Sequence, residues 1–200
     1  MYTIVGLGNP GGEYAHHRHN TGRSIVSALA KERGIALGEK KKPPHVVGTG
    51  VVANEKVRVV LPDTFMNKSG SAVAPYIKSA KAAEKLILVC DDIDLPLGKV
   101  RVSFGSSSGG HNGVRSVERA LKTKNFIKIR VGISKLSRGK AKKPDGEEAI
   151  IGHLLGNFTK GELEKVRGPV AERVRLALKT IFETHDPVMG MNAINGLPIV

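Results

Sequence analysis

The amino-terminal segment decides the fold, because it joins a strand-like run to a glycine-rich loop. Tyr2–Val5 is apolar, as in a buried strand, and Gly6–Gly22 continues it with GLGNPGGEYAHHRHNTG. The glycines at positions 6, 8 and 11 have the spacing G-x-G-x-x-G. Directly after a strand, that spacing is typical of a loop that binds the pyrophosphate of a dinucleotide.

The residues that follow contradict a dinucleotide loop. Such a loop needs a helix that begins at its last glycine, but PGG at Pro10–Gly12 opposes a helix, and Glu13–Asn20 has no helical apolar period. An acidic residue for the ribose is expected about 20 residues further on. That region, Ser24–Gly34, reads as an amphipathic helix with Glu32 near its end. We therefore predict that the loop delivers Asn9 and a histidine to the end of a strand.

The rest of the chain alternates short β-branched runs with helical patterns. This alternation is typical of a mixed, mostly parallel sheet with helices on both faces. We expect a single α/β domain over residues 1–200, with a twisted sheet flanked by helices and a C-terminal helix packed on its body. The predicted strands are Tyr2–Val5, Val46–Ala53, Val57–Leu61, Leu86–Cys90, Lys99–Phe104 and Lys128–Ser134, and the predicted helices are Ser24–Arg33, Ser71–Ala80, Val114–Leu121 and Pro169–Thr184.

Composition fits a globular intracellular protein. The chain has 200 residues, 40% of them hydrophobic, which suffices for a substantial core. The single Cys90 excludes a disulfide framework, and no Cys/His set has structural zinc spacing. There is no run of about 18 apolar residues, and strand-like sequence at residue 2 leaves no targeting segment. We expect a cytoplasmic protein without a membrane segment.

Positive charge dominates the chain and predicts a polyanionic partner. The formal net charge is +14, and nine of the twenty-two residues in Lys122–Lys143 are Lys or Arg, with no acidic residue among them. A single basic run is most often a solvated surface, but the charge of the whole chain favours contact with nucleic acid. With no Trp, three Tyr and five Phe, a base-stacking platform is not expected. Backbone phosphates should be the main contact, and Ser137–Glu147 is predicted as a flexible basic loop.

Polar residues follow several predicted strands at the edge where ligands bind in such sheets. Asn9 follows the first strand, Asn67 follows the strand ending at Leu61, and Asp91 follows Cys90. His19 lies just before a helix and could act as a general base near neutral pH. With His16 and His17 it could instead form a metal tract, but adjacent side chains diverge and no carboxylate shares the segment.

The segment CDDIDLPLG at Cys90–Gly98 presents three candidate carboxylates. Asp91, at the tip of a buried strand, is suited to bond an imidazole, fix its tautomer and stabilise the imidazolium. A divalent-cation site built from Asp91, Asp92 and Asp94 is the alternative, as is simple turn chemistry. We favour the histidine partner for Asp91 and turn chemistry for the other two.

Two further segments supply amide side chains. SSSGGHNGVRS at Ser106–Ser116 delivers His111 and Asn112 to the start of a helix, and it lacks the Lys-Ser/Thr ending of a P-loop. TFMNKSG at Thr64–Gly70 places Asn67 before a helix, where an N-cap is the plain structural alternative. One histidine, one aspartate and three asparagines, without a serine elbow or metal ligands, indicate attack by water on an activated ester, with amides positioning the oxyanion.

The motifs together resemble the bacterial-type peptidyl-tRNA hydrolase family. The resembling segments occur in family order across residues 4–158. They are GLGNPGGEYAHHRHNTG, TFMNKSG, DDIDLPLG, GGHNGVRS, KIRVGI and HLLGNF. The resemblance implies a largely monomeric α/β enzyme that hydrolyses the ester between a peptide and the terminal ribose of tRNA, without metal or cofactor.

The resemblance also assigns roles to individual positions. His19 matches the catalytic histidine and Asp91 the aspartate that orients it. Asn9, Asn67 and Asn112 match asparagines at the peptide end of the cleft, Tyr14 and Met66 match residues that flank it, and Arg130 matches one cation of the pair that grips the tRNA 5′-phosphate. Lys135 and Arg101 are further candidates for phosphate contact.

The chain departs from the family pattern near the expected phosphate site. Ser103 stands where the second cation of the pair is common, Ser134 replaces a usual glycine, and the basic stretch Lys135–Lys143 is longer than usual. Two other functions remain open from the sequence. One is a non-catalytic RNA-binding protein on the same scaffold, like the plastid intron-splicing factors. The other is a nucleotide-dependent oxidoreductase, whose melting temperature would rise with NAD(P); we expect no such shift.

Overall fold

A central sheet of parallel strands with antiparallel edges organises the molecule. The computed structural model describes residues 1–200, and its strand order is β2-β3-β4-β1-β5-β7-β6, with β8 paired to β7. Pairing is parallel between β4, β1, β5 and β7 and antiparallel elsewhere. The strands are β1 (Tyr2–Gly6), β2 (Gly38–Lys41), β3 (Pro44–Val52), β4 (Glu55–Pro62), β5 (Leu86–Pro96), β6 (Val100–Phe104), β7 (Ile127–Ser137) and β8 (Lys140–Lys142).

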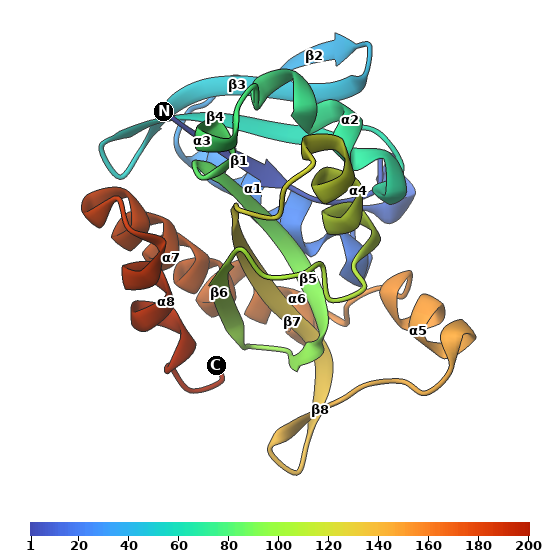
Figure 1. Ribbon diagram of the computed structural model, residues 1–200. Coiled ribbons are helices and arrows are strands. Elements are labelled where there is room, and N and C mark those ends of the chain that lie inside the picture. The colour runs from blue at the N-terminus through green and yellow to red at the C-terminus, as the bar shows by residue number, and fades with distance from the viewer.

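Helices cover both faces of this sheet, as the sequence predicts (Figure 1). Helices α2 and α4 lie on one face, while α1 and α7 lie on the other. None of the helices has the length and apolar character needed to cross a membrane. Their bounds are α1 (Thr21–Glu32), α2 (Ser69–Val73), α3 (Ala80–Ala83), α4 (Asn112–Leu121), α5 (Glu147–Leu154), α6 (Lys160–Lys165), α7 (Ala171–Thr184) and α8 (Pro187–Asn195).

Alternating side chains of the central strands build a core on each face. In β1, Ile4 points toward the layer of α1 and α7, whereas Val5 points toward α4. Both side chains are fully buried. Because successive residues of a strand face opposite sides, continuous apolar runs such as β1 and β5 need cover on both faces. The single-domain α/β architecture expected from the sequence is therefore the one observed.

The glycines of the first loop allow close packing of α1 against the sheet. A Cβ atom on Gly22 would lie 2.0 Å from the carbonyl oxygen of Val89, and one on Gly6 would lie 2.7 Å from that of Gly22. Real Cβ atoms do not approach so closely, so a side chain at either position would push α1 away from β1 and β5. At these two positions the absence of a side chain therefore permits close contact between α1 and the sheet.

Several predicted elements differ from the observed ones. The helix expected over Ser71–Ala80 is interrupted, because Pro75 lies in a 3-10 turn, Ala74–Tyr76, that separates α2 from α3. The strand expected to end at Cys90 continues to Pro96, with an irregularity between Asp92 and Pro96. The helical segment between α6 and α7 is broken at Gly168, whose backbone is non-helical at φ −94° and ψ −106°.

Part of the segment predicted as a flexible basic loop, Ser137–Glu147, forms a hairpin through Lys142, while residues 143–146 belong to no helix or strand. Lys135, Leu136 and Ser137 of β7 pair with Lys142, Ala141 and Lys140 of β8. The left-handed Arg138, at φ 49°, and Gly139, at φ 77°, form its turn. The β3–β4 hairpin turns at Ala53 and Asn54, both with positive φ. In Figure 1 the β7–β8 hairpin projects from the lower edge of the molecule.

Candidate active site

Two cavities meet at His19, beyond the carboxyl end of β1. We call the first the basic cavity, because Lys128, Arg130 and Lys143 line it, and the second the asparagine cavity, because Asn9, Asn67 and Asn112 line it. His19, Asn112 and Leu154 line both cavities. The expectation that one edge of the sheet collects these polar residues is therefore met. A substrate spanning both cavities would pass directly over His19.

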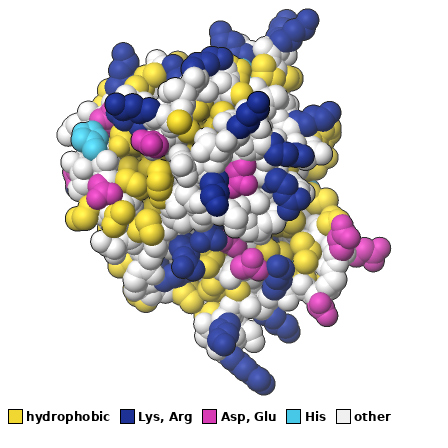
Figure 2. Space-filling view, viewed as in Figure 1, with side chains coloured by type: hydrophobic (Ala, Val, Ile, Leu, Met, Phe, Trp, Pro, Cys, Tyr) yellow, Lys and Arg dark blue, Asp and Glu magenta, His cyan; other side chains and the backbone are white.

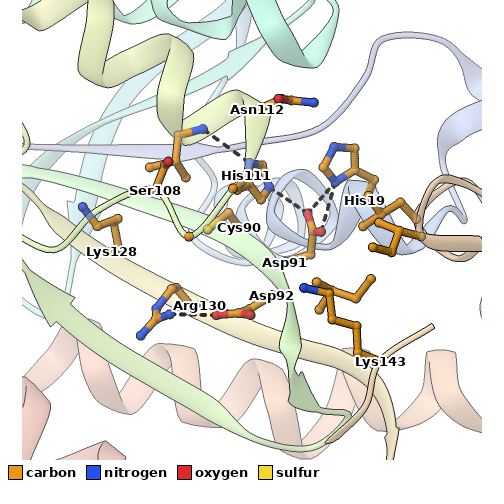
Figure 3. Close-up of a pocket in the computed structure, with 16 residues that line it drawn as sticks. His19, Cys90, Asp91, Asp92, Ser108, His111, Asn112, Lys128, Arg130 and Lys143 are labelled. Carbon is orange, nitrogen blue, oxygen red and sulfur yellow. Dashed lines mark hydrogen bonds and ion pairs between the residues drawn. The ribbon is translucent and has the colours of Figure 1, made fainter. Parts of the chain in front are cut away.

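His19, Asp91 and His111 form a buried hydrogen-bonded group (Figure 3). His19 Nδ1 lies 3.0 Å from each carboxylate oxygen of Asp91, and His111 Nε2 lies 3.0 Å from Asp91 Oδ1. Asp91 is only 2% exposed and His19 8%. A short 3-10 turn at Arg18–Asn20 presents His19 directly before α1, while β5 carries Asp91. The predicted histidine partner of Asp91 is thus present, although Asp91 lies within β5 and not at its end.

The hydrogen bonds fix the tautomers of both histidines. His111 caps the first turn of α4, where its Nδ1 accepts from the backbone N–H groups of Gly113 at 3.1 Å and Val114 at 3.3 Å. Its proton therefore resides on Nε2, which donates to Asp91. His19 Nδ1 donates to the same carboxylate, so the lone pair of a neutral His19 is on Nε2. That nitrogen has no partner within the protein and can bind a water molecule in the cleft.

Burial and the Asp91 charge act in opposite directions on the pKa of His19. Burial disfavours the imidazolium, but the charge of Asp91 and its hydrogen bond more than offset this, so the pKa of His19 lies above its ordinary value. Burial also opposes ionisation of Asp91, yet the two histidines hold the pKa of that carboxyl well below its usual range. The ionised Asp91 can therefore stabilise a proton on His19.

Asn9 is held by a reciprocal pair of hydrogen bonds to Asn20. The Asn20 side chain accepts from the backbone N–H of Asn9 and donates to its carbonyl oxygen, both at 2.9 Å. The Asn9 side-chain oxygen in turn accepts from the backbone N–H of Met66 at 2.9 Å. Its NH2 group is left for another partner. Asn9 is thus a buried, oriented amide donor on the wall of the asparagine cavity.

Asn67 and Asn112 present free amide groups beside His19. Neither side chain has a hydrogen bond within the protein, and both are exposed. The N-cap alternative for Asn67 does not apply, because Phe65 and Lys68 occupy the cap positions of the two short helices there. Both amides can therefore bind a ligand directly.

Of the two residues expected to flank the peptide end of the cleft, only Met66 lines a cavity. Tyr14 stacks edge-on against His17, with ring centroids 5.2 Å apart. It lines neither the basic cavity nor the asparagine cavity. The structure therefore places Met66 at the cleft, as the motif predicted. It places Tyr14 outside both cavities.

The basic cavity has a cationic wall on β7. Lys128 is 1% exposed, donates to the carbonyl oxygen of Ser106, and lies 3.7 Å from Glu118 Oε1. Burial lowers its pKa. Arg130 donates to Asp92 Oδ2 at 2.9 Å, so its guanidinium is held at the mouth of the cavity. The basic cavity therefore carries positive charge from two side chains of β7, one buried and one part-exposed.

Cross-strand pairing between β6 and β7 brings one of the remaining phosphate candidates, Arg101, beside this wall. Arg101 lies opposite Arg130 in the β6–β7 register, and Ser103 lies opposite Lys128, so all four share one face of the sheet. Arg101 and Lys135 are exposed outside the cavity. Figure 2 shows Lys and Arg scattered over this face and over the projecting β7–β8 hairpin. Arg101 is thus an exposed cation on the same face of the sheet as Arg130.

Comparison with known proteins identifies the family. The sequence model of the family described as peptidyl-tRNA hydrolase matches residues 3–198. This chain belongs to the peptidyl-tRNA hydrolase family. The peptidyl-tRNA hydrolase of Limosilactobacillus reuteri (strain DSM 20016) is 39% identical over 196 residues, which is 98% of this chain and 100% of that protein.

Other relatives agree in sequence and in structure. A peptidyl-tRNA hydrolase of Dehalococcoides mccartyi (strain ATCC BAA-2100 / JCM 16839 / KCTC 5957 / BAV1) is 40% identical over 173 residues, 86% of this chain and 88% of that protein. The crystal structure of peptidyl-tRNA hydrolase from Acinetobacter baumannii superposes with a TM-score of 0.84 at 34% identity, covering 98% of this chain and 95% of that one. The resemblance stated from the motifs is therefore confirmed, and the observed fold is that of the family.

The sequence did not predict the roles of three residues at this site. His111 was noted only as part of a loop, yet it binds Asp91 and caps α4. Asn20 orients Asn9, and Lys128 lines the basic cavity. The sequence GGHNG directly before a helix could have indicated a capping histidine. Nothing local indicates that Asn20 or Lys128 is buried.

The metal alternatives fit the structure poorly. His19, Asp91 and His111 are close enough to hold an ion, but His111 Nε2 would have to lose its proton, and Nδ1 would then gain one and release both α4 amides. Asp92 accepts from the Asp94 backbone N–H, the predicted turn bond, and pairs with Arg130. The nitrogen and oxygen atoms of these side chains are therefore arranged for hydrogen bonds to one another, and this arrangement is poorly suited to binding a metal ion.

Proposed function

We propose that this chain hydrolyses the ester that joins the peptide to the tRNA in peptidyl-tRNA, with His19 as the general base. The single observation that carries the proposal is the buried His19–Asp91 pair, whose free Nε2 atom opens on a cleft lined by three asparagines. The family of the chain supports the substrate class.

The proposed reaction uses the protein groups in sequence. His19 Nε2 takes a proton from water as the water oxygen bonds to the ester carbonyl carbon, and Asp91 stabilises the resulting imidazolium. Amide N–H groups of Asn67 and Asn112 hold the carbonyl oxygen as it gains negative charge. Collapse of the intermediate breaks the bond to the ribose oxygen, which receives the proton from His19. The products are a tRNA with a free hydroxyl and a peptide carboxylic acid, which ionises to the carboxylate and releases its proton to solvent.

Water is the favoured nucleophile because no protein side chain is placed to replace it. Cys90 lines the basic cavity, but it is fully buried, and burial and the neighbouring carboxylates raise the pKa of its thiol. No serine hydroxyl bonds to His19. General-base catalysis therefore needs no covalent intermediate on the protein.

The two cavities suit the two halves of the substrate. The asparagine cavity carries exposed apolar side chains, Phe65, Ile151 and Leu155, beside its amides, which suits a peptide with its backbone and apolar side chains. The basic cavity suits the phosphates near the tRNA end. We infer that Arg130, Lys135 and Arg101 contact backbone phosphates, and that Lys128 supplies the positive charge absent at Ser103.

We further infer that the enzyme acts as a cytoplasmic monomer. A net charge of +14 opposes self-association. Translation supplies peptidyl-tRNA in the cytoplasm. Light scattering coupled to size exclusion at several protein concentrations tests the monomer, and a concentration-dependent dimer would refute it.

The decisive experiment follows release of an N-blocked amino acid from tRNA by the wild type and by His19→Ala. Loss of a general base should lower kcat at least ~100-fold. His16→Ala is the matched control, because His16 is exposed in the same loop. Near-normal turnover by His19→Ala would refute the mechanism. If the wild type binds structured RNA but does not cleave this substrate, the non-catalytic RNA-binding function would replace it.

A further inference from the structure

Helix α5 forms a wall of both cavities but has few attachments of its own. Ile150 and Leu154 line the basic cavity, and Ile151, Leu154 and Leu155 line the asparagine cavity. No residue of α5 is buried. Its side-chain hydrogen bond to the sheet runs from His153 Nε2 to the carbonyl oxygen of Ile133, at 3.0 Å. In Figure 1, α5 projects at the lower right, away from the sheet. The position of this wall must therefore be fixed from outside the helix.

Arg18 is the side chain that connects the end of α5 to the active site. Its Nη1 donates to the carbonyl oxygen of Asn157 at 2.7 Å, and its Nη2 donates to Glu162 Oε2 at 2.9 Å. Its guanidinium also lies over the ring of Phe158, 5.2 Å from the centroid. One planar side chain thus binds three residues of the segment that follows α5.

The backbone on either side of Arg18 strengthens this connection. The Arg18 N–H donates to the carbonyl oxygen of Gly156 at 3.0 Å, and the Phe158 N–H donates to that of His16 at 3.2 Å. A Cβ atom on Gly156 would lie 3.0 Å from Arg18 Nη1, so the glycine leaves room for the guanidinium. The segment after α5 is therefore paired with the segment that ends at His19.

Glu162 is itself fixed at the start of α6, so it gives Arg18 a rigid partner. Thr159 and Glu162 form a reciprocal capping box. Burial opposes ionisation of Glu162, but the bonds from Thr159 and the charge of Arg18 hold its pKa below the ordinary value. The Arg18–Glu162 pair is largely buried, with side chains 11% and 20% exposed. Such a pair sets geometry more than it adds stability.

We propose that Arg18 is a positioning residue that holds α5 at a fixed distance from His19, and so shapes the peptide side of the cleft. Arg18 lines neither cavity, and it acts through Gly156–Phe158 on Ile151 and Leu155. Its removal lets α5 move away, which weakens binding of the acyl part of the substrate. His19 keeps its partner Asp91, so the chemical step is preserved. The kinetic part of this proposal rests on the proposed hydrolysis of peptidyl-tRNA.

The test compares Glu162→Gln and Arg18→Lys with the wild type. Glutamine removes the charge of the partner, while lysine keeps the positive charge but cannot bond two acceptors as a planar fork. Glu164→Gln is the matched control, because Glu164 is an exposed carboxylate on the same helix without an ion-pair partner. KM and kcat are measured with N-blocked aminoacyl-tRNA across pH. Amide hydrogen exchange is measured separately for residues 147–158.

Both variants are expected to raise KM about 3- to 10-fold with kcat within about 2-fold, as for a lost binding contact. Exchange should accelerate in residues 147–158 and not in the core of β1 and β5. The acid limb of the pH profile should stay in place, and Glu164→Gln should match the wild type.

Three results would overturn the proposal. The first is unchanged KM and exchange in both variants. The second is a fall in kcat or a shift of the acid limb, which would mean that Arg18 acts on His19 itself. The third is faster exchange throughout the protein, which would mean general stabilisation. Hydrogen exchange does not depend on activity, so it tests the role of Arg18 even if the chain does not hydrolyse peptidyl-tRNA. Failure of the proposed function would instead appear as absence of turnover by the wild type.

Discussion

The His19 group and the β7–β8 hairpin are built in opposite ways. His19 and Asp91 are buried, His111 is partly buried, and each has a hydrogen bond that fixes its direction. Residues 135–142 of the hairpin carry exposed cations without an ion pair, and Lys143, directly after β8, pairs with Asp94 at 3.0 Å. General-base catalysis needs one proton acceptor in one orientation, whereas phosphate attraction depends on total charge. The two regions should therefore respond differently to single substitutions.

The largest effect on kcat should come from Asp91→Asn. This substitution removes the negative charge of the His19 group and keeps the shape of the side chain. Asparagine cannot stabilise the imidazolium or enforce the Nδ1–H tautomer, and the corresponding change in a serine protease triad costs about 10⁴-fold in kcat. We expect a fall of at least ~100-fold in kcat. Asp145→Asn, an exposed aspartate, should be neutral. A drop of less than ~10-fold would show that Asp91 is not needed to orient His19.

The same variant should move the acid limb of the pH profile. Activity requires neutral His19, so kcat/KM rises with pH through the pKa of His19. In the wild type that pKa lies above its ordinary value because Asp91 outweighs burial. Without the Asp91 charge, burial remains, and the limb should shift to lower pH. A limb that stays in place, or that moves upward, would contradict this account.

A smaller effect is expected from His111→Asn, which separates two roles of one residue. Asparagine is a good N-cap, so α4 should keep its first turn and the melting temperature should change little. The bond to Asp91 is lost, and we expect kcat to fall about 10-fold. His111→Ala should lower kcat similarly but also lower the melting temperature. Equal melting temperatures for the two variants would show that the N-cap at position 111 does not stabilise α4.

The smallest effect of a single change is expected in the basic region. Lys135→Gln and Arg101→Gln should each raise KM about 3-fold and reduce the slope of log KM against log salt by about 1, with kcat unchanged. Lys179→Gln on α7 is the control, since α7 covers the other face of the sheet. If KM does not depend on salt, the cations only solubilise the protein. If one substitution abolishes binding, the basic region is as specific as the His19 group.

Sequence patterns predicted the central sheet and the chemistry of the cleft. The strand at Tyr2–Val5, the α1 pattern and the strand beginning at Leu86 are local signals, because a buried strand and an amphipathic helix each leave their own periodicity. Asn9, His19 and Asp91 follow from polar residues at the ends of such runs. The prediction of one helix over Ser71–Ala80 was wrong. It followed the apolar pattern of the segment, but the proline at position 75 divides the segment.

Long-range contacts explain the residues that the sequence did not reveal. Arg18 bonds to Asn157 and Glu162 across separations of 139 and 144 residues. The bond between Lys128 and the Ser106 carbonyl likewise depends on the packing of a loop against β7. No local sequence pattern indicates either contact, because a charged residue in a strand or loop is normally predicted to be exposed to solvent.

The sequence by itself determined the family, the α/β class and the groups available for catalysis, because these depend on residue types in order along the chain. Tertiary structure alone decided that Gly6 and Gly22 serve close packing of α1, that His111 joins His19 on Asp91, and that Arg18 ties α5 to the active site. The physical reason is that steric contact, burial and hydrogen-bond partners belong to pairs of residues far apart in sequence. Their geometry exists only once the sheet and its helices have packed together.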